Sequence, residues 1–421
     1  MNNVQFMPGW RHMKILLVTL GIGAGLSQPS MAASSAPLSA DAQALVDRAF
    51  SGLEGLELVD YHVHMLGLGA GGTGAGVNPR LLSWSHPISR LKAKIFFKSA
   101  GIADEADADR QYVGRLLALA QGFPKPTRLA ILGFDYRRDP EGRIDRDNSE
   151  IYVPNDYVVG LAGRYPDSFI PVVSVHPYDP EALSKLEAYA KQGVRIVKWL
   201  PNAQGMDPSD PAIDPYYRLM ARHGMILLCH SGDEASVHSK GGQKLGNPLL
   251  LRRALDNGVR VILAHAGNRG DNEDLDRPGS TVRNFDLFLR MMDDQRYKDL
   301  LFADISAVTQ TIRSRRDLEV LLERDDLHAR LVNGSDYPLP AIDYFIMPAL
   351  LQYSGFITGG ERRALNEIYR HNPLLFDFVL KRTLRHPKTG AQFPARMFAA
   401  HPALALEAQA GQDRHPHARG E

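Results

Sequence analysis

The sequence contains a single cysteine, Cys229, among its 421 residues. A single thiol excludes an internal disulfide, and the cysteine count therefore does not fix the redox compartment. Side chains alternate along a strand, so Cys229 and its neighbour His230 are expected on opposite faces. This excludes a paired Cys/His nucleophile, and the lack of a Gly-x-Ser-x-Gly elbow argues against a serine hydrolase.

The sequence also lacks an excess of charge of one sign. Lys and Arg total 49 and Asp and Glu total 48, so the net charge is +1. Nothing in this balance indicates nucleic acid or an anionic membrane surface as a partner. With 44% hydrophobic residues, the chain is expected to fold around a large core as one domain.

The N-terminus has the parts of an export signal. Arg11 and Lys14 precede an apolar run over residues 15–26, and Ser30 and Ala32 follow at the spacing that a signal peptidase recognises. The run is too short to span a bilayer, and no cysteine follows it as in a lipoprotein. We therefore expect a signal peptide over residues 1–32, cleavage after Ala32, and a periplasmic or secreted protein; an uncleaved anchor is the alternative. Residues 33–50 are expected to be a linker.

Eight short apolar segments alternate with helical patterns over residues 51–385, which predicts a parallel sheet of α/β type. Eight strand–helix units predict a (β/α)8 TIM barrel with extra C-terminal helices. Residues 386–421 are expected to form a partly disordered tail, whose histidines (His386, His401, His415 and His417) are solvated. The predicted strands cover residues 56–64, 127–136, 168–177, 194–201, 225–230, 260–267, 300–306 and 331–338.

The segment after the first predicted strand is long and begins with glycine. Residues 67–76 contain Gly-x-Gly-x-x-Gly, but Pro79 follows closely and no helix opens on the last glycine, as a dinucleotide fingerprint requires. We expect a flexible loop beside the barrel mouth. Residues 80–126 read as a helical insertion that forms a partial lid.

Titratable residues close several of the predicted strands. In a barrel the carboxyl ends of the strands meet at one rim, which is where TIM-barrel active sites lie. A buried lysine or aspartate is costly there unless it is paired or bound to a metal. Strand alternation predicts that Leu58, Asp60, His62 and His64 share one face, and it turns Trp199 away from the rim. The rim residues are His62, His64, Lys198, His230, His265 and Asp336.

The pattern of these residues resembles the amidohydrolase superfamily, in which His-x-His, Lys, His, His and Asp lie on successive barrel strands. The contexts Asp-Tyr-His-Val-His, Ile-Val-Lys-Trp-Leu-Pro and Asn-Gly-Ser-Asp-Tyr-Pro are most similar to its amidohydrolase-related branch. That branch includes metal-dependent hydrolases and decarboxylases related to aminocarboxymuconate-semialdehyde decarboxylase. The resemblance covers residues 55–385 and does not name a substrate.

The resemblance implies two arrangements of metal ligands, which the sequence leaves open. In the first, His62, His64 and Asp336 bind one divalent ion together with His230. In the second, a carbamylated Lys198 bridges two ions, and His230 and His265 hold the second one. Imidazole and carboxylate ligands suit zinc first, with manganese or iron as alternatives. An ion of this kind lowers the pKa of a water molecule toward ~7.

The remaining assignments concern catalysis and substrate. Asp336 is expected to take the proton of the water and pass it to the leaving group. His265, if it is not a ligand, is expected to hydrogen-bond the hydroxide or to polarise the substrate carbonyl. Lys198 is a candidate for substrate contact. His176 is a candidate for substrate contact or for capping its strand, and Arg269 for binding a carboxylate or for a surface ion pair. The neighbours of His230 in the chain, Asp233 and Glu234, are candidates for orienting a ligand or substrate amine; Asp60 is expected to hydrogen-bond an imidazole from below.

These assignments predict a metal-dependent hydrolase that cleaves an amide, ester or lactone bond of a small molecule. A decarboxylase on the same fold is the alternative, because the same residues would serve to protonate carbon. A catalytically silent barrel that binds a metabolite or metal is the alternative from another class, and it predicts the loss of a ligand. None is lost. No nucleic acid or membrane partner is expected after signal cleavage, and a homo-oligomer is compatible with the sequence.

Overall fold

A barrel of parallel strands organises the fold. The computed structural model describes residues 37–239 and 241–406. Eight strands form one sheet in the order of the sequence. The last strand is joined to the first by backbone hydrogen bonds, from Asp336 to His62 at 2.8 Å and from His64 to Tyr337 at 2.9 Å. The TIM barrel expected from the sequence is confirmed. Its strands are β1 (Leu58–His64), β3 (Thr127–Leu132), β5 (Phe169–Val173), β6 (Ile196–Trp199), β7 (Ile226–Cys229), β8 (Arg260–Leu263), β11 (Leu301–Asp304) and β12 (Leu331–Val332).

The barrel has two separate apolar layers because side chains alternate along each strand. The inner layer is a small cluster that includes Val59, Ile196, Leu228 and Phe302. The outer layer packs against the helices and contains Trp199 and Cys229, which therefore point away from the barrel interior as predicted.

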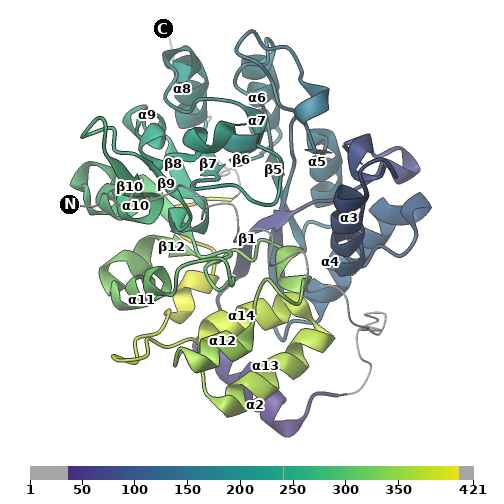
Figure 1. The fold of residues 1–421 in the computed structure, drawn as a ribbon, viewed down its shortest axis with the longest axis vertical. Helices are drawn as coiled ribbons and strands as arrows, with labels where there is room; N and C mark the ends of the chain where they lie inside the picture. Colours follow the sequence, from purple (N-terminus) through teal and green to yellow (C-terminus); the bar gives the residue numbers. More distant parts are fainter. Residues whose placement is uncertain (1–36, 240, 407–421) are drawn as a thin grey trace, which may run out of the picture.

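Helices surround this sheet (Figure 1). Most follow a strand and return the chain to the start of the next one, while α3 and α4 belong to the insertion after β1 and lie on one side of the molecule. The helices are α2 (Ala40–Phe50), α3 (Pro87–Ser99), α4 (Ala108–Gln121), α5 (Asn155–Arg164), α6 (Ala182–Lys191), α7 (Pro201–Gln204), α8 (Asp214–Arg222), α9 (Arg252–Asp256), α10 (Asn284–Asp293), α11 (Arg315–Glu323), α12 (Pro348–Tyr353), α13 (Gly359–His371) and α14 (Pro373–Thr383).

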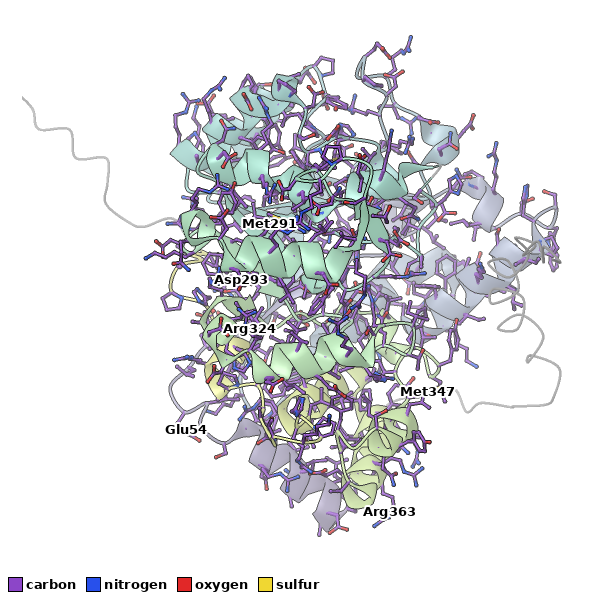
Figure 2. All side chains as sticks on the ribbon, turned by 60° about the vertical axis from the view of Figure 1, so that its left-hand side comes forward. Glu54, Met291, Asp293, Arg324, Met347 and Arg363 are labelled. Carbon is purple, nitrogen blue, oxygen red and sulfur yellow. The ribbon has the colours of Figure 1, made fainter. Side chains whose placement is uncertain are left out.

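Ion pairs join neighbouring helices of the outer ring. Asp293 ends α10 and Arg324 follows α11, and Figure 2 shows the two side by side. Their side chains form an ion pair of 2.6 Å at the surface. Exposed pairs of this kind contribute less than about 1 kcal/mol, so burial between the helices and the sheet provides most of the stability.

Helix α2 lies in the segment that was predicted to be a linker. The Ser39 side chain accepts a hydrogen bond from Ala42 N and begins the helix. The buried face then packs on the C-terminal helices, and the rings of Phe50 and Phe378 lie 4.7 Å apart. The linker prediction is wrong for residues 40–50, because the apolar spacing within this short segment is enough to bury one helix face.

The segment after α14 closes the amino-terminal end of the barrel. Leu404 is buried and belongs to the inner apolar layer, and His401 donates its backbone N–H to the Tyr61 hydroxyl at 2.9 Å. His386 is buried as well. The expectation of solvated histidines is therefore wrong for these two. His401 is held by Tyr61 and by the Ala329 carbonyl, whereas His386 Nδ1 accepts from the backbone N–H groups of Lys388 and Thr389 in its own turn. His415 and His417 lie outside the described residues.

The predicted signal peptide also falls outside the described residues, which begin at position 37. None of the helices within residues 37–239 and 241–406 combines the length and apolar character needed to cross a bilayer.

Candidate active site

The rim residues predicted from the sequence meet at the carboxyl end of the barrel. His62 Nε2 lies 3.0 Å from Lys198 Nζ and 3.6 Å from Asp336 Oδ1. His64 Nε2 lies 3.1 Å from the same Asp336 oxygen. The His265 ring is 5.0 Å from the His62 ring and 5.1 Å from the His230 ring, measured between centroids. All six residues thus surround one small volume.

Three of these residues have the geometry of metal ligands. One ligand atom from each of His62, His64 and Asp336 lies within 4.8 Å of the other two. His230 Nε2 is buried and has no hydrogen-bond partner among the described residues; the nearest carboxylate oxygen is that of Glu234, at 3.4 Å. A buried nitrogen without a hydrogen bond is costly unless something else occupies its lone pair. The donor set therefore fits a divalent ion.

Asp304 is a site residue that the sequence analysis missed. Its Oδ2 lies 2.8 Å from His62 Nδ1. A carboxylate only accepts hydrogen bonds, so Nδ1 carries the proton and Nε2 keeps the lone pair that a metal needs. The signal was present in the sequence, because Asp304 closes the apolar seventh segment as the other site residues close theirs.

The same carboxylate controls a second imidazole through a serine. The Ser306 hydroxyl donates to Asp304 Oδ1 and lies 2.7 Å from His265 Nδ1. Since the hydroxyl proton is directed at Asp304, Ser306 Oγ accepts from His265 Nδ1–H, and His265 Nε2 is left with its lone pair. The backbone N–H of His265 also donates to Asp304 Oδ1, at 2.9 Å. Asp304 thus fixes the tautomers of both histidines.

Burial sets the protonation of the site. It lowers the pKa of His62 and His265 well below the usual value and that of His230 to about 4, so all three are neutral at pH 7. Burial also lowers the pKa of Lys198. Burial alone would raise the pKa of Asp336, but the hydrogen bond from His64 and the nearby charges lower it to about 2. The site therefore offers neutral imidazoles and an ionised carboxylate.

Two of the site residues have left-handed backbone conformations. The φ angles are +58° at His265 and +61° at Asp336, a region that residues other than glycine rarely adopt. Close packing next to Asp336 leaves room only for glycine at position 334, since a Cβ there would lie 2.9 Å from His62 Cβ. Buried Lys381 donates to the Gly334 carbonyl at 2.6 Å and so fixes this turn from the helix layer.

Asp60 does not contact an imidazole. The β1 register shifts between Asp60 and Val63, which places a bulge just before the histidines. Val59 therefore packs in the inner layer and Leu58 in the outer one, so the prediction that Leu58 and Asp60 share the face of His62 is wrong. Asp60 Oδ1 instead accepts from the backbone N–H groups of His62 and Ser335, at 3.1 and 2.9 Å.

His176 is also placed differently from the prediction. It is fully buried, its Nδ1 accepts from Tyr178 N at 3.1 Å, and its Nε2 donates to the Gln204 carbonyl at 3.1 Å. Both ring nitrogens are thus used within the protein, and burial lowers the pKa of His176 to about 3. The prediction that His176 contacts substrate is wrong, because the loops after β5 and β6 pack on it.

A pocket of about 340 Å³ opens over the rim. Arg269, Asp233 and Glu234 line it, whereas Lys198 is not among its lining residues in the described part of the chain and lies against His62. Arg313, which the sequence analysis missed, also lines the pocket. It follows β11 in a loop to which no strand pattern applies.

Arg313 is positioned by a partner at the rim. Its guanidinium donates to Asn268 Oδ1 at 2.8 Å, and burial lowers its pKa to about 10, so it remains charged at pH 7. The charges nearest to it include those of Asp336 and Arg269. The pocket therefore contains two arginines next to the ligand set, and they can bind an anionic group of a substrate.

The insertion after β1 forms one wall of the pocket. Phe96 and Phe97 of α3 contribute apolar side chains to it. The glycine-rich loop ahead of α3 is fixed by buried Asp109, whose carboxylate accepts from Leu68 N at 2.7 Å, from Ala70 N at 3.1 Å and from the Thr73 hydroxyl. The lid expected from the sequence is thus present as a wall, and the loop beneath it is held by side-chain hydrogen bonds.

Comparisons with known proteins agree with this arrangement. A family model described as Amidohydrolase matches residues 59–344, which include all six rim residues. No curated protein sequence matches the chain at a significant level.

Several solved structures are similar in fold. A TIM-barrel protein from Bordetella bronchiseptica is 16% identical, with a TM-score of 0.46 and coverage of 74% of this chain and 99% of that chain. A 5-carboxyvanillate decarboxylase from Sphingomonas paucimobilis is 13% identical (TM-score 0.38, 75% and 98% covered). A 4-oxalomesaconate hydratase from Rhodopseudomonas palustris is 14% identical (TM-score 0.38, 73% and 92% covered). Values this low leave the reaction open.

Proposed function

Because this chain belongs to the amidohydrolase family, we propose that it is a metal-dependent hydrolase that cleaves an amide, ester or lactone bond of a small molecule. The observation that carries the proposal is the convergence of His62, His64 and Asp336 beside the unpartnered Nε2 of His230. Zinc is the metal that this donor set suits first. A divalent ion held there would supply Lewis-acid activation of water and of the substrate carbonyl.

The chain's own residues supply the proton transfers. Asp336 is ionised and accepts a proton on a carboxylate oxygen, then returns it to the leaving group. His265 Nε2 faces the same volume and is kept free of its own proton by the bond from Nδ1 to Ser306. It therefore serves as a hydrogen-bond acceptor toward water, or as a ligand.

Substrate orientation is assigned to the two arginines and to the apolar wall. Arg269 and Arg313 hold a carboxylate or another anionic group, while Phe96, Phe97 and Leu339 cover the body of the molecule and exclude water. Lys198 remains either a bridging ligand after carbamylation or a cation next to His62. The carbamylated lysine corresponds to a site with two ions, and the cation next to His62 to a site with one ion.

A decarboxylase is the second candidate, and the arginines favour it as much as they favour hydrolysis, because both reactions would suit a carboxylate substrate. A silent binding barrel fits less well, since the ligand set, the proton acceptor and the pocket are all retained. We also propose that the protein acts in the periplasm, on the basis of the N-terminal signal.

The test combines elemental analysis with product analysis. The purified protein is expected to hold one or two equivalents of zinc per chain and to lose activity on chelation, with recovery on adding zinc back. A screen of amides, esters and lactones in water labelled with oxygen-18 is expected to place the label in the product. Release of carbon dioxide with no label in the organic product would change the assignment to a decarboxylase. A chain that neither binds metal nor recovers activity would contradict the proposal that the protein is a metalloenzyme.

A further inference from the structure

Helix α3 has two apolar faces, and the barrel covers only one of them. Ala93 and Phe97 are buried against the pocket wall. Ile88 and Leu91, on the opposite side of the helix, are 65% and 48% exposed, and Trp84 just ahead of the helix is 79% exposed. Residues three apart share one helix face, so Ile88 and Leu91 form one apolar surface. Trp84 lies ahead of the helix, and its ring lies 4.2 Å from the Arg90 guanidinium and 6.0 Å from Lys94 Nζ on the same helix. A single exposed apolar residue is ordinary, but a contiguous group indicates a partner.

The charged residues of α3 itself are all of one sign. They are Arg90, Lys92, Lys94 and Lys98, although the whole chain is nearly neutral and acidic residues follow the end of the helix from Asp104 onward. Lys92, Lys94 and Lys98 are exposed, and none of them forms an ion pair within the described part of the chain. The Arg90 guanidinium lies 4.2 Å from the Trp84 ring centroid, so that cation too is turned toward the apolar surface.

We propose that this face of α3 docks on the surface of an anionic lipid bilayer. Apolar side chains flanked by lysines, with a tryptophan at the edge, are the composition of a helix that lies in the membrane interface. The lysine stems extend along the apolar surface and carry their charges to lipid phosphates. This face of α3 consists of Trp84, Ile88 and Leu91 together with Lys94 and Lys98.

A second copy of this chain suits the face less well. A symmetric contact between two copies of α3 would place the lysines of one helix against those of the other, and the helix itself has no carboxylate to compensate. Figure 1 places α3 on one side of the molecule, away from the C-terminal helices α12, α13 and α14. Docking would bring the pocket wall formed by Phe96 and Phe97 next to the lipid.

The experiment is sedimentation of the purified protein with lipid vesicles, independent of enzyme activity. Vesicles of phosphatidylcholine with about a third phosphatidylglycerol are compared with pure phosphatidylcholine, at low and high salt. Binding is expected only to the anionic vesicles and to weaken with salt. The variants Ile88→Ser/Leu91→Ser and Lys94→Glu/Lys98→Glu are each expected to weaken it about tenfold or more, and neither pair lines the pocket.

A matched control and a spectroscopic readout complete the test. Leu183→Ser with Lys191→Glu on α6 removes an exposed apolar residue and reverses an exposed cation elsewhere, and binding is expected to be unchanged. The emission of Trp84 is expected to shift to the blue on docking, and the shift is lost in Trp84→Phe.

Four outcomes overturn the proposal. The first is that the protein binds no vesicle, and the second is that it binds neutral and anionic vesicles equally. The third is that vesicle binding survives both α3 variants, which would assign it to residues 1–36 or to another face. The fourth is that the protein binds no vesicle and forms a dimer that Ile88→Ser/Leu91→Ser dissociates.

Discussion

The barrel interior is apolar at its amino-terminal end and lined by ionisable side chains at its carboxyl end. At the amino-terminal end the interior is aliphatic and aromatic, and Leu404 from the C-terminal segment closes it. At the carboxyl end the same strands finish in buried His62, Lys198, His265 and Asp336. Left-handed backbone also occurs at this end, at His265 and Asp336, where regular strand geometry stops.

The two ends therefore contribute to the free energy of folding with opposite signs. The amino-terminal end gains free energy from burying apolar area, about 25 cal/mol per Å². The carboxyl end buries ionisable groups that are individually unfavourable, and hydrogen bonds to Asp304 and Lys381 compensate part of this cost. Substitutions at one end are therefore expected to change folding, and those at the other to change chemistry.

The largest effect is expected from Asp336→Asn at the carboxyl end. The amide keeps the shape but cannot accept the transferred proton, so kcat is expected to fall by about 10²–10⁴-fold. The thermal unfolding midpoint should change little, and Asp299→Asn at an exposed position should leave both quantities unchanged. Wild-type turnover in Asp336→Asn would contradict the role of this carboxylate.

Leu404→Ala tests the opposite end. Removing this buried side chain leaves a cavity in the inner layer, and the free energy of unfolding is expected to drop by about 2–5 kcal/mol, measured by urea denaturation. The metal content and kcat/KM of the folded protein should stay as in the wild type. Exposed Leu183→Ala is the matched control and should cost less than about 0.5 kcal/mol. A loss of activity greater than the loss of folded protein would show that the two ends are coupled.

Asp304→Asn acts in the layer just beneath the ligands. Three donors hold the remaining amide oxygen at the Oδ1 position, so the amide NH2 faces His62 Nδ1 and that nitrogen loses its acceptor. Zinc binding is expected to weaken about 10–100-fold, measured by competition with a chelator. Ser306→Ala removes the contact to His265 and the hydroxyl donor to Asp304 but leaves the bond from His62 to Asp304, so it should have a smaller effect. Equal affinities in wild type and Asp304→Asn would mean that the imidazoles are oriented by packing alone.

The smallest effect concerns pH and lies outside both ends, at His176. Its pKa falls from 6.5 in the unfolded chain to about 3 in the fold. Between these values the unfolded chain binds a proton that the folded protein does not, so stability is complete above pH 6.5 and declines as the pH falls. The decline per histidine is at most about 1.4 kcal/mol per pH unit.

His176→Gln should therefore show a shallower decline in unfolding free energy between pH 6.5 and about 4, with the slopes of the two proteins equal above pH 7. The comparison of slopes is independent of any constant loss caused by the substitution. Parallel curves over the whole range would indicate that His176 is charged in the fold.

Much of this architecture follows from local patterns, and the departures have specific causes. Apolar runs that end in a titratable residue predicted all eight strands and the six rim residues. Local sequence was enough for this, because the carboxyl end of each parallel strand of a barrel lies at the same rim. Asp60 was misplaced because the β1 bulge depends on pairing with β3, a partner that is remote in the sequence. Arg313 and the His176 contact with Gln204 depend on loops meeting in space, where no periodicity exists.

The closure of the barrel has a consequence for how the site comes into being. Asp60 and Ser335, which are joined by a hydrogen bond at the seam between β1 and β12, are 275 positions apart in the chain. Such a contact has a high loop-closure entropy and belongs to the slow part of folding. Before the seam forms, the chain presents His62 and His64 without Asp336. The full donor set is therefore complete only in the finished fold, so a divalent ion that needs all three ligands would stabilise the native state over the unfolded chain.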